Sequence, residues 1–343
     1  MQLARHVARQ CKERVFEALA RCFFTARAEF SALLWDNDIF SPRNTDAYYT
    51  NGFIYHHVSD PVPAESGRQW RSCPGLSTLA GLMEPVLIRT HEKTRYRHSW
   101  GMGQIIQAPD DLAPIVPDPY DQPCAGLLFG SCGFHVQEDG RAESLGLMVG
   151  VTGPWSLADR SEDIAHDITG SEYPLGWDHQ RHNEVVVNMM YDRQRVMTHI
   201  PLGENGLIFF DNLGFAFGTL AIRGTAGLNM LFANNLRAAF SLRPSFLGRY
   251  PWLSQQQPLG FYSVGSLQMT VVARNLFLDG NTWQDSPAVD TQPVVGSGQL
   301  VMGYGFSCTA FQLGLNISSR TFETQTSSWP RYGTLAMIWG CSP

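Results

Sequence analysis

The chain has 343 residues, a formal net charge of −6 at pH 7 and 16% charged residues, together with 44% hydrophobic residues and 32 glycines. The length suits one large all-β domain or two ordinary domains. The negative charge, without a basic stripe carrying interleaved aromatics, argues against nucleic-acid binding. The sequence has no apolar run of about 18 residues, which excludes a transmembrane helix. A transmembrane barrel stays open, because its strands carry apolar residues only at alternate positions.

Residues 1–28 differ in composition from the rest of the chain. They carry six arginine or lysine residues against two glutamates, and they end in the small-x-small pattern Ala26-Arg27-Ala28. Such an ending is typical of a signal cleavage site, but Glu17 and Arg21 interrupt the apolar core that a secretory signal has. We interpret residues 1–28 as a degenerate signal or leader and residues 29–343 as one domain. An amphipathic helix, or upstream sequence translated from a wrong start, is the alternative.

Period-two alternation dominates the chain after Glu29. Leu213, Phe215 and Phe217, for example, alternate with small residues. This pattern predicts β-strands. The same pattern or similar runs occur at 30–38, 50–59, 95–106, 125–136, 144–151, 185–192, 226–234, 238–246, 261–273, 299–306, 313–317 and 332–339. The sequence therefore predicts about a dozen strands with turn clusters between them.

Helical signal after the leader is confined to one segment. Residues 156–168 are predicted to form a short helix, with Asp159, Glu162 and Asp163 early in it, where a helix N-terminus favours negative charge. His166 then lies near the C-terminal end, and Gly170 stops the helix. The proline- and aspartate-rich segments 107–123 and 278–296 are predicted to be structured loops.

Two all-β architectures fit this pattern. A soluble β-sandwich alternates apolar with charged positions, whereas the positions between the bulky residues here are often Gly, Ala, Ser, Thr or Asn. An antiparallel transmembrane β-barrel of about 12 strands fits better, and aromatics near strand ends suit its interfacial girdles. The aromatics that we expect there are Trp35, Tyr48, Tyr49, Phe53, Trp155, Trp252, Phe261, Tyr262 and Trp339.

Seven cysteines are scattered along the chain without a C-x-x-C motif, which argues against a zinc ribbon or a dense disulfide scaffold. Buried or lipid-facing free thiols are the favoured interpretation. A disulfide between Cys124 and Cys132, which flank a predicted strand, is the alternative.

A histidine, two carboxylates, an amide and a hydroxyl are the parts of a metal-assisted ester hydrolase. The chain offers His166 and Glu172 in one segment, Asn37 and Asp38 in a second, and Thr50 in a third. Calcium takes hard oxygen ligands, and a neighbouring histidine can deprotonate water. The sequence has no G-x-S-x-G elbow, no zincin spacing after His91-Glu92 and no complete EF-hand loop. The competing interpretation is that these residues are ordinary caps and turn residues.

Ordered motifs over roughly residues 30–339 resemble the lipid A deacylase family, outer-membrane enzymes that remove 3′-O-linked acyl chains. The motifs are Trp35-Asp-Asn-Asp-Ile-Phe40, Asn44-Thr-Asp-Ala-Tyr-Tyr-Thr-Asn-Gly52, Pro117-Asp-Pro-Tyr-Asp-Gln-Pro-Cys-Ala-Gly126, Gly150-Val-Thr-Gly-Pro154, His166-Asp-Ile-Thr-Gly-Ser-Glu172, Gly176-Trp-Asp-His-Gln180, His182-Asn-Glu184, Ala273-Arg-Asn-Leu-Phe-Leu-Asp-Gly-Asn-Thr282 and Arg331-Tyr-Gly-Thr-Leu335.

The resemblance implies a role for each candidate residue. His166 would be the general base that activates water, Asn37 would hold the carbonyl or oxyanion, and Glu172 would support the site. Asp38 would bind Ca²⁺, with the Thr50 hydroxyl as a further ligand or substrate contact. The implied protein is a monomeric barrel of the Gram-negative outer membrane that acts on lipid A or lipopolysaccharide. A catalytically silent barrel, structural or porin-like, is the alternative function, and a soluble β-sandwich binding module is another.

Overall fold

The structure is a computed structural model that describes residues 29–42, 47–59, 62–63, 95–138, 140–169, 173–234 and 260–340. The predicted leader, residues 1–28, and the predicted strand at 238–246 lie outside the described residues.

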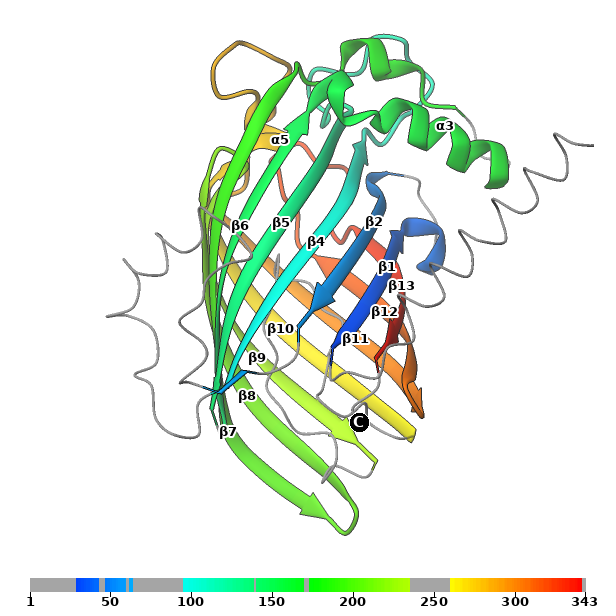
Figure 1. Cartoon of the computed structure of the whole chain (residues 1–343). Helices are drawn as coiled ribbons and strands as arrows, with labels where there is room; N and C mark the ends of the chain where they lie inside the picture. The colour runs from blue at the N-terminus through cyan, green and yellow to red at the C-terminus, as the bar shows by residue number, and fades with distance from the viewer. Residues whose placement is uncertain are drawn as a thin grey trace, which may run out of the picture.

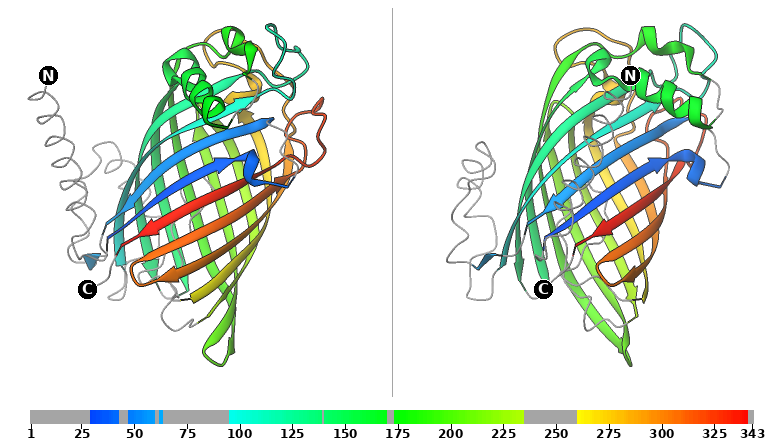
Figure 2. Two further views of the ribbon diagram at one scale, coloured as in Figure 1. Left: turned by 90° about the vertical axis from the view of Figure 1, so that its right-hand side faces the viewer. Right: turned by 45° about the vertical axis from the view of Figure 1, so that its right-hand side comes forward.

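The described residues form a closed antiparallel barrel of twelve strands (Figure 1). The barrel closes because β1 pairs with both β2 and β13, and β2 pairs with β4 (Figure 2). The two-residue β3 (Val62–Pro63) adds a short pairing to β4. The predicted twelve-stranded antiparallel barrel is confirmed. Its strands are β1 (Phe30–Asn37), β2 (Tyr48–Val58), β4 (Arg95–Ala108), β5 (Ala125–Glu138), β6 (Arg141–Thr152), β7 (Glu184–Leu202), β8 (Asn205–Gly218), β9 (Ala221–Ala233), β10 (Gly260–Asn275), β11 (Val294–Phe306), β12 (Thr309–Ser318) and β13 (Arg331–Trp339).

The outer wall carries the exposed apolar residues. Leu267 is 73% exposed, and Phe217 and Leu228 are similarly open. Successive strand residues face opposite sides, so the alternation seen in the sequence places these side chains outside and small or polar ones inside. An apolar exterior is what a membrane-spanning barrel presents to lipid. The sandwich alternative is therefore wrong.

The exposed fractions agree with the girdle prediction for only part of the set. Trp35, Phe53, Trp155 and Phe261 are exposed, as a girdle requires. Tyr48, Tyr49 and Tyr262 are buried instead, and the hydroxyls of all three are hydrogen-bonded within the protein. Trp252 lies outside the described residues. Aromatic content alone did not say which side of the wall a ring occupies.

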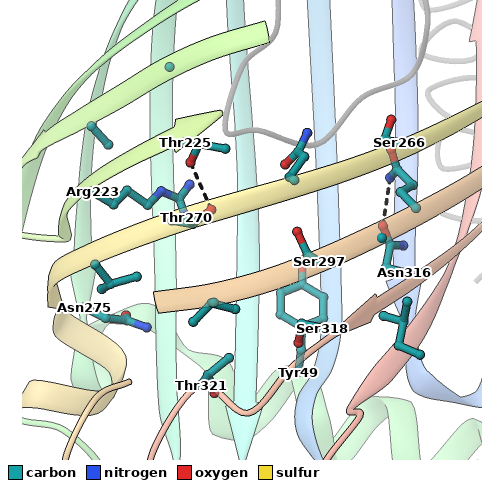
Figure 3. A pocket seen from close by; sticks show the side chains of 18 of the residues that line it. Tyr49, Arg223, Thr225, Ser266, Thr270, Asn275, Ser297, Asn316, Ser318 and Thr321 are labelled. Atoms are coloured by element: carbon teal, nitrogen blue, oxygen red, sulfur yellow. Dashed lines mark hydrogen bonds between the residues drawn. The ribbon is translucent and has the colours of Figure 1, made fainter. Parts of the chain in front are cut away.

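The barrel interior contains both apolar packing and a polar cavity. Ile208, Phe210, Tyr262, Val264 and Val301 belong to one buried cluster inside the wall. A cavity of about 310 Å³ is lined largely by hydroxyl and amide side chains such as Thr225, Ser266, Thr270, Ser297 and Asn316 (Figure 3).

Three helical pieces lie between β6 and β7 at one end of the barrel (Figure 1). They are η2 (Gly153–Ser156), α3 (Ala158–Thr169) and η3 (Leu175–His179). The predicted helix is confirmed, although it begins at Ala158, because Leu157 has a φ of 55° and interrupts the turn. Two further short helices, η1 (Asp38–Phe40) and α5 (Leu276–Asp279), lie in other loops. Within the described ranges, no helix is both long and apolar enough to cross a membrane.

The cysteines differ from the expectation. Cys132 and Cys308 are disulfide-bonded, whereas Cys124 is a buried free cysteine. The alternative Cys124–Cys132 disulfide is therefore not formed. The prediction of free thiols is correct for Cys124 and wrong for Cys132 and Cys308.

Candidate active site

The first two strands bring Asp38 and Thr50 to the same end of the β1–β2 pair. The register of β1 and β2 ends with Asn37 opposite Asn51, and Asp38 and Thr50 are the next residues of the two segments beyond this pair. Both side chains are 2% exposed. The Asp38 carboxylate accepts a hydrogen bond from the backbone N–H of Ala47 at 3.2 Å. The two residues predicted as metal ligands are therefore both buried at the same end of the β1–β2 pair.

Strand β2 has a β-bulge at Thr50, where its register with β4 shifts by one residue. Tyr49 pairs with Gln107 and Asn51 pairs with Ile106, which leaves Thr50 as the extra residue of β2. A bulge of this kind re-aims a side chain and is common beside active sites. Tyr49 lines the lumen cavity, whereas the Thr50 hydroxyl donates to the Glu162 carboxylate of α3 at 3.1 Å.

Glu162 and His166 occupy one face of α3. They are four residues apart, a spacing that puts two side chains on the same side of a helix. Glu162 is 1% exposed and His166 is 6% exposed, while Asp163 and Asp167 between and beside them are exposed. The His166 ring lies 6.2 Å from the ring of Tyr173. The Tyr173 hydroxyl donates a hydrogen bond to Asp167, and this bond raises the pKa of Tyr173.

The helix is held against the outer face of the wall. Ile105 packs into an interior cluster, so the next residue, Ile106, faces outward, where it packs with Ala158 and Trp177. The Gln104 amide of β4 donates to the carbonyl of Ser156 at 2.7 Å. The site thus lies between the outside of the barrel and α3.

A glycine permits this close approach. A Cβ built on Gly126 of β5 would lie 2.2 Å from the Cβ of Ala158 and 2.3 Å from the Oγ of Ser156. These distances are far below a van der Waals contact, so any larger residue would push η2 and the start of α3 away from the wall. Gly126 therefore sets the distance between the wall and the face that carries Glu162 and His166.

Trp177 and Arg181 anchor the segment that follows the helix. The Trp177 indole N–H donates to the second Glu162 carboxylate oxygen at 2.6 Å. Arg181 is fully buried and donates to the carbonyl of Phe277 at 2.7 Å and to the Ser286 hydroxyl at 3.1 Å. Burial lowers the pKa of Arg181 to about 10. These contacts join the β6–β7 connection to the β10–β11 connection and hold Trp177 in place.

Asn37 caps the turn that presents Asp38. Its amide oxygen accepts a hydrogen bond from the backbone N–H of Ile39 at 2.9 Å, at the start of η1. The cap uses the oxygen, so the amide N–H groups are what Asn37 can offer to a carbonyl or oxyanion. Gly333 of β13 lets η1 lie against the wall, because a Cβ there would come within 2.4 Å of the Cβ of Phe40.

The donor chemistry of the site fits a hard cation. Asp38, Thr50 and Glu162 supply only oxygen, which suits calcium or magnesium rather than a thiolate-binding metal. Among the described residues, no group of three or more His, Cys, Asp or Glu is arranged to hold a metal. A cation here would therefore need hydroxyl, water or substrate oxygens beside the carboxylates, as calcium sites commonly use.

Three of the five predicted site residues, Asn37, Asp38 and Thr50, lie at one end of the β1–β2 pair. His166 shares the buried face of α3 with Glu162, which accepts a hydrogen bond from Thr50. Glu172 lies outside the described residues. Sequence reasoning missed the contact made by Glu162, which it interpreted only as negative charge early in a helix. The available signal was its spacing of four from His166.

Fold and site together define an outer-membrane β-barrel with a polar, histidine-containing site on its outer wall. The profile of the family described as outer membrane protein LpxR matches residues 7–341. The chain belongs to this family, which is the lipid A deacylase family that the sequence motifs resemble, and it is an outer-membrane protein.

Solved structures agree with this fold. LpxR from Salmonella typhimurium is similar with a TM-score of 0.73 at 18% identity, covering 91% of this chain and 99% of that chain. The beta domain of the Bordetella autotransporter Brka reaches a TM-score of only 0.41 at 6% identity, covering 91% and 98% of the two chains, which carries no structural argument. No curated protein matches the sequence.

Proposed function

We propose that this protein is an esterase that hydrolyses the 3′-O-linked acyl chain of lipid A by calcium-assisted, histidine-activated attack of water. The observation that carries the proposal is the hydrogen bond from Thr50 to Glu162, which joins the buried face of α3 that also carries His166 to the end of the β1–β2 pair. Family membership supports the substrate class.

The position of the site suits an ester at the boundary of a bilayer. Trp35 and Phe53 face each other across β1 and β2, and both are exposed on the outer wall, at 40% and 51%. Trp35 lies three residues before Asp38, and Phe53 lies three residues after Thr50, a spacing of about 10 Å along a strand. An acyl chain lying along this apolar wall would bring its ester linkage to the polar residues without leaving the membrane.

In the proposed reaction, His166 accepts a proton from water while the water oxygen attacks the ester carbonyl carbon. The resulting tetrahedral centre collapses, the acyl carbon–oxygen bond breaks, and the proton held by His166 passes to the leaving sugar oxygen. The products are a free fatty acid and a hydroxyl on the glycolipid.

The remaining residues stabilise charge. The Asn37 amide N–H groups are donors for the oxyanion, and such donors contribute most when they are already in place. Asp38 and the Thr50 oxygen would hold calcium, with Glu162 close by. Bound calcium would supply polarisation of the ester carbonyl and compensation of the oxyanion charge. Glu172 is proposed to support this site rather than to act as a nucleophile.

The porin alternative receives less support from the interior. In the part of the chain that the structure describes, the inside of the wall carries the buried cluster of Ile208, Phe210, Tyr262, Val264 and Val301. Packed apolar and aromatic side chains narrow a lumen, whereas a porin keeps an aqueous channel.

The proposal is tested with purified protein in detergent and lipid A in water enriched in ¹⁸O. We expect calcium-dependent release of one fatty acid carrying a single ¹⁸O in its carboxyl group, and loss of release on chelation by EGTA. Unlabelled fatty acid, or release that EGTA does not change, would contradict the mechanism. Steady ion conductance with no release would favour the porin.

A further inference from the structure

Both oxygens of the Glu162 carboxylate accept hydrogen bonds. The Trp177 indole N–H donates to Oε2 at 2.6 Å, and the Thr50 hydroxyl donates to Oε1 at 3.1 Å. Glu162, Thr50 and Trp177 are 1%, 2% and 7% exposed, so solvent does not compete for these bonds. The three residues come from α3, the β2 bulge and η3, which meet only in the folded chain.

This arrangement fixes which way the Thr50 hydroxyl points. A hydroxyl has one proton to give and lone pairs to offer, and its rotation is otherwise open. A carboxylate accepts hydrogen bonds and an indole N–H only donates them, so the direction of both bonds is set. A second acceptor of the Thr50 hydroxyl, the carbonyl of Ile106, is 3.5 Å away. A shorter bond to a charged acceptor is the stronger one.

We propose that Trp177 is a positioning residue that acts through Glu162 to keep the Thr50 oxygen as an electron-pair donor. With its proton committed to Glu162, the Thr50 oxygen presents only lone pairs to a cation beside Asp38. The inference rests on the proposed function, because it assigns the orientation of a ligand of that site. It adds that the affinity for calcium depends on an indole that does not itself reach the cation.

The test measures calcium binding directly, by isothermal titration calorimetry on the purified full chain in detergent. Trp177→Phe keeps an aromatic ring but removes the donor, and we expect the calcium dissociation constant to rise about tenfold, as for a hydrogen bond to a charged group. Trp155→Phe is the matched control, because Trp155 lies in the neighbouring η2 but is 57% exposed. It should bind calcium like the wild type.

A second variant asks whether Trp177 acts through Glu162. Trp177 and Thr50 meet different oxygens of Glu162, and Glu162→Gln keeps an oxygen at only one of these two positions, so it cannot accept at both. If the indole takes that oxygen, the amide N–H groups face Thr50 and force its hydroxyl to accept, which weakens calcium binding. Adding Trp177→Phe frees the amide to turn its oxygen to Thr50. The double variant should therefore bind calcium no more weakly than Glu162→Gln alone.

The outcomes separate this inference from the proposed function. If Trp177→Phe binds calcium as tightly as the wild type, or if the effects of the two substitutions multiply, the positioning role is overturned and the esterase proposal stands. If the wild type binds no calcium, both are overturned. Heat-modifiable gel mobility identifies any variant that fails to fold. If Trp177→Phe fails to fold, Trp177→His, whose ring N–H can still donate, should bind calcium more tightly than Trp177→Leu, which has no donor, and equal affinities of these two variants would overturn the positioning role.

Discussion

The outer-wall site and the lumen are both polar, yet they are built differently. In the outer site, Glu162 and His166 share the buried face of α3, and Glu162 accepts a hydrogen bond from the Thr50 hydroxyl of the wall. The lumen cavity carries mainly hydroxyl and amide groups, several of them on β9 to β12, as Figure 3 shows. The charged residues that line it, Asp192, Arg223 and Arg331, come from three different strands, β7, β9 and β13, and among the described residues its lining includes no histidine. The chemistry of this barrel is therefore expected outside its wall.

The lumen groups satisfy one another across strands. Gln299 donates to Asn316 at 2.8 Å, and Asn316 donates to Thr334 at 3.0 Å. Thr334 and Tyr49 then donate to the two oxygens of Asp36 at 2.6 and 2.9 Å. This chain ends on β1 and β2, directly beside the residues that present Asp38 and Thr50. The lumen thus supports the outer site by fixing the two strands that carry it.

Among the substitutions in the two regions, removal of the His166 ring from the outer site should lower the rate of hydrolysis most. His166→Ala is expected to lower kcat for lipid A hydrolysis by about 10²–10⁴-fold, the usual contribution of a general base. The measurement is fatty-acid release by the purified variant, with barrel integrity checked by heat-modifiable mobility. Retention of more than a tenth of the activity would contradict the assigned role.

Displacing the helix should give the next largest effect. Gly126→Ala is expected to push η2 and α3 from the wall and to lower activity about 10²-fold, because small displacements of catalytic groups are costly. Gly130→Ala is the matched control, since Gly130 lies on the same strand and its added Cβ would meet nothing within 4 Å. Equal effects of the two substitutions would show that α3 need not touch the wall.

A lumen substitution should barely change catalysis. Gln299→Ala removes one bond of the cross-strand chain, which costs about 1 kcal/mol of folding stability. We expect kcat within about two-fold of the wild type, because a neutral residue away from the reacting atoms adds little to the barrier. A loss comparable to that of Gly126→Ala would mean that the lumen takes part in the reaction.

The smallest effect is predicted at Cys124, which packs with Trp177 beneath the helix. Burial, together with the charge of Glu162, raises the pKa of Cys124 to about 12 from 9.0. At pH 9 only about one thiol in a thousand would be ionised, so iodoacetamide should not label Cys124 in the folded protein. Peptide mass spectrometry checks this, with the unfolded chain as the labelled control.

The same shift has a consequence for stability. The folded pKa of Cys124 lies above the unfolded one, so the neutral thiol contributes fully to stability below about pH 9 and this contribution is lost as the pH rises towards 12. If iodoacetamide labelled Cys124 at pH 8 in correctly folded protein, this would show that α3 opens away from the barrel wall.

The strands were predictable because burial alternates along them. Leu213, Phe215 and Phe217 are exposed on the outer wall, as their period-two pattern indicated. The pattern missed the last ten residues of β7, from Arg193 to Leu202, because charged and apolar residues follow one another there without alternation. Pairing with β8, rather than a local signal, makes that segment a strand.

The site was predictable in its parts and not in its arrangement. Asp38 and Thr50 stood out as polar residues near strand ends, but their proximity depends on the β1–β2 register and on a bulge that no local motif marks. Glu162 was one of several acids on a short helix, and its burial, together with its spacing of four from His166, distinguishes it from Asp163 and Asp167. Burial of a charged side chain depends on tertiary contacts, which the sequence does not reveal directly.

The central claim is that the outer-wall site removes an acyl chain from lipid A. The most direct measurement is mass spectrometry of lipid A from Gram-negative cells that express the wild type or His166→Ala, each with verified insertion in the outer membrane. We predict that the wild type yields lipid A lacking the 3′-O-linked acyl chain and that His166→Ala leaves lipid A intact. Intact lipid A in the presence of inserted wild type would contradict the account, and so would acyl loss that persists in His166→Ala.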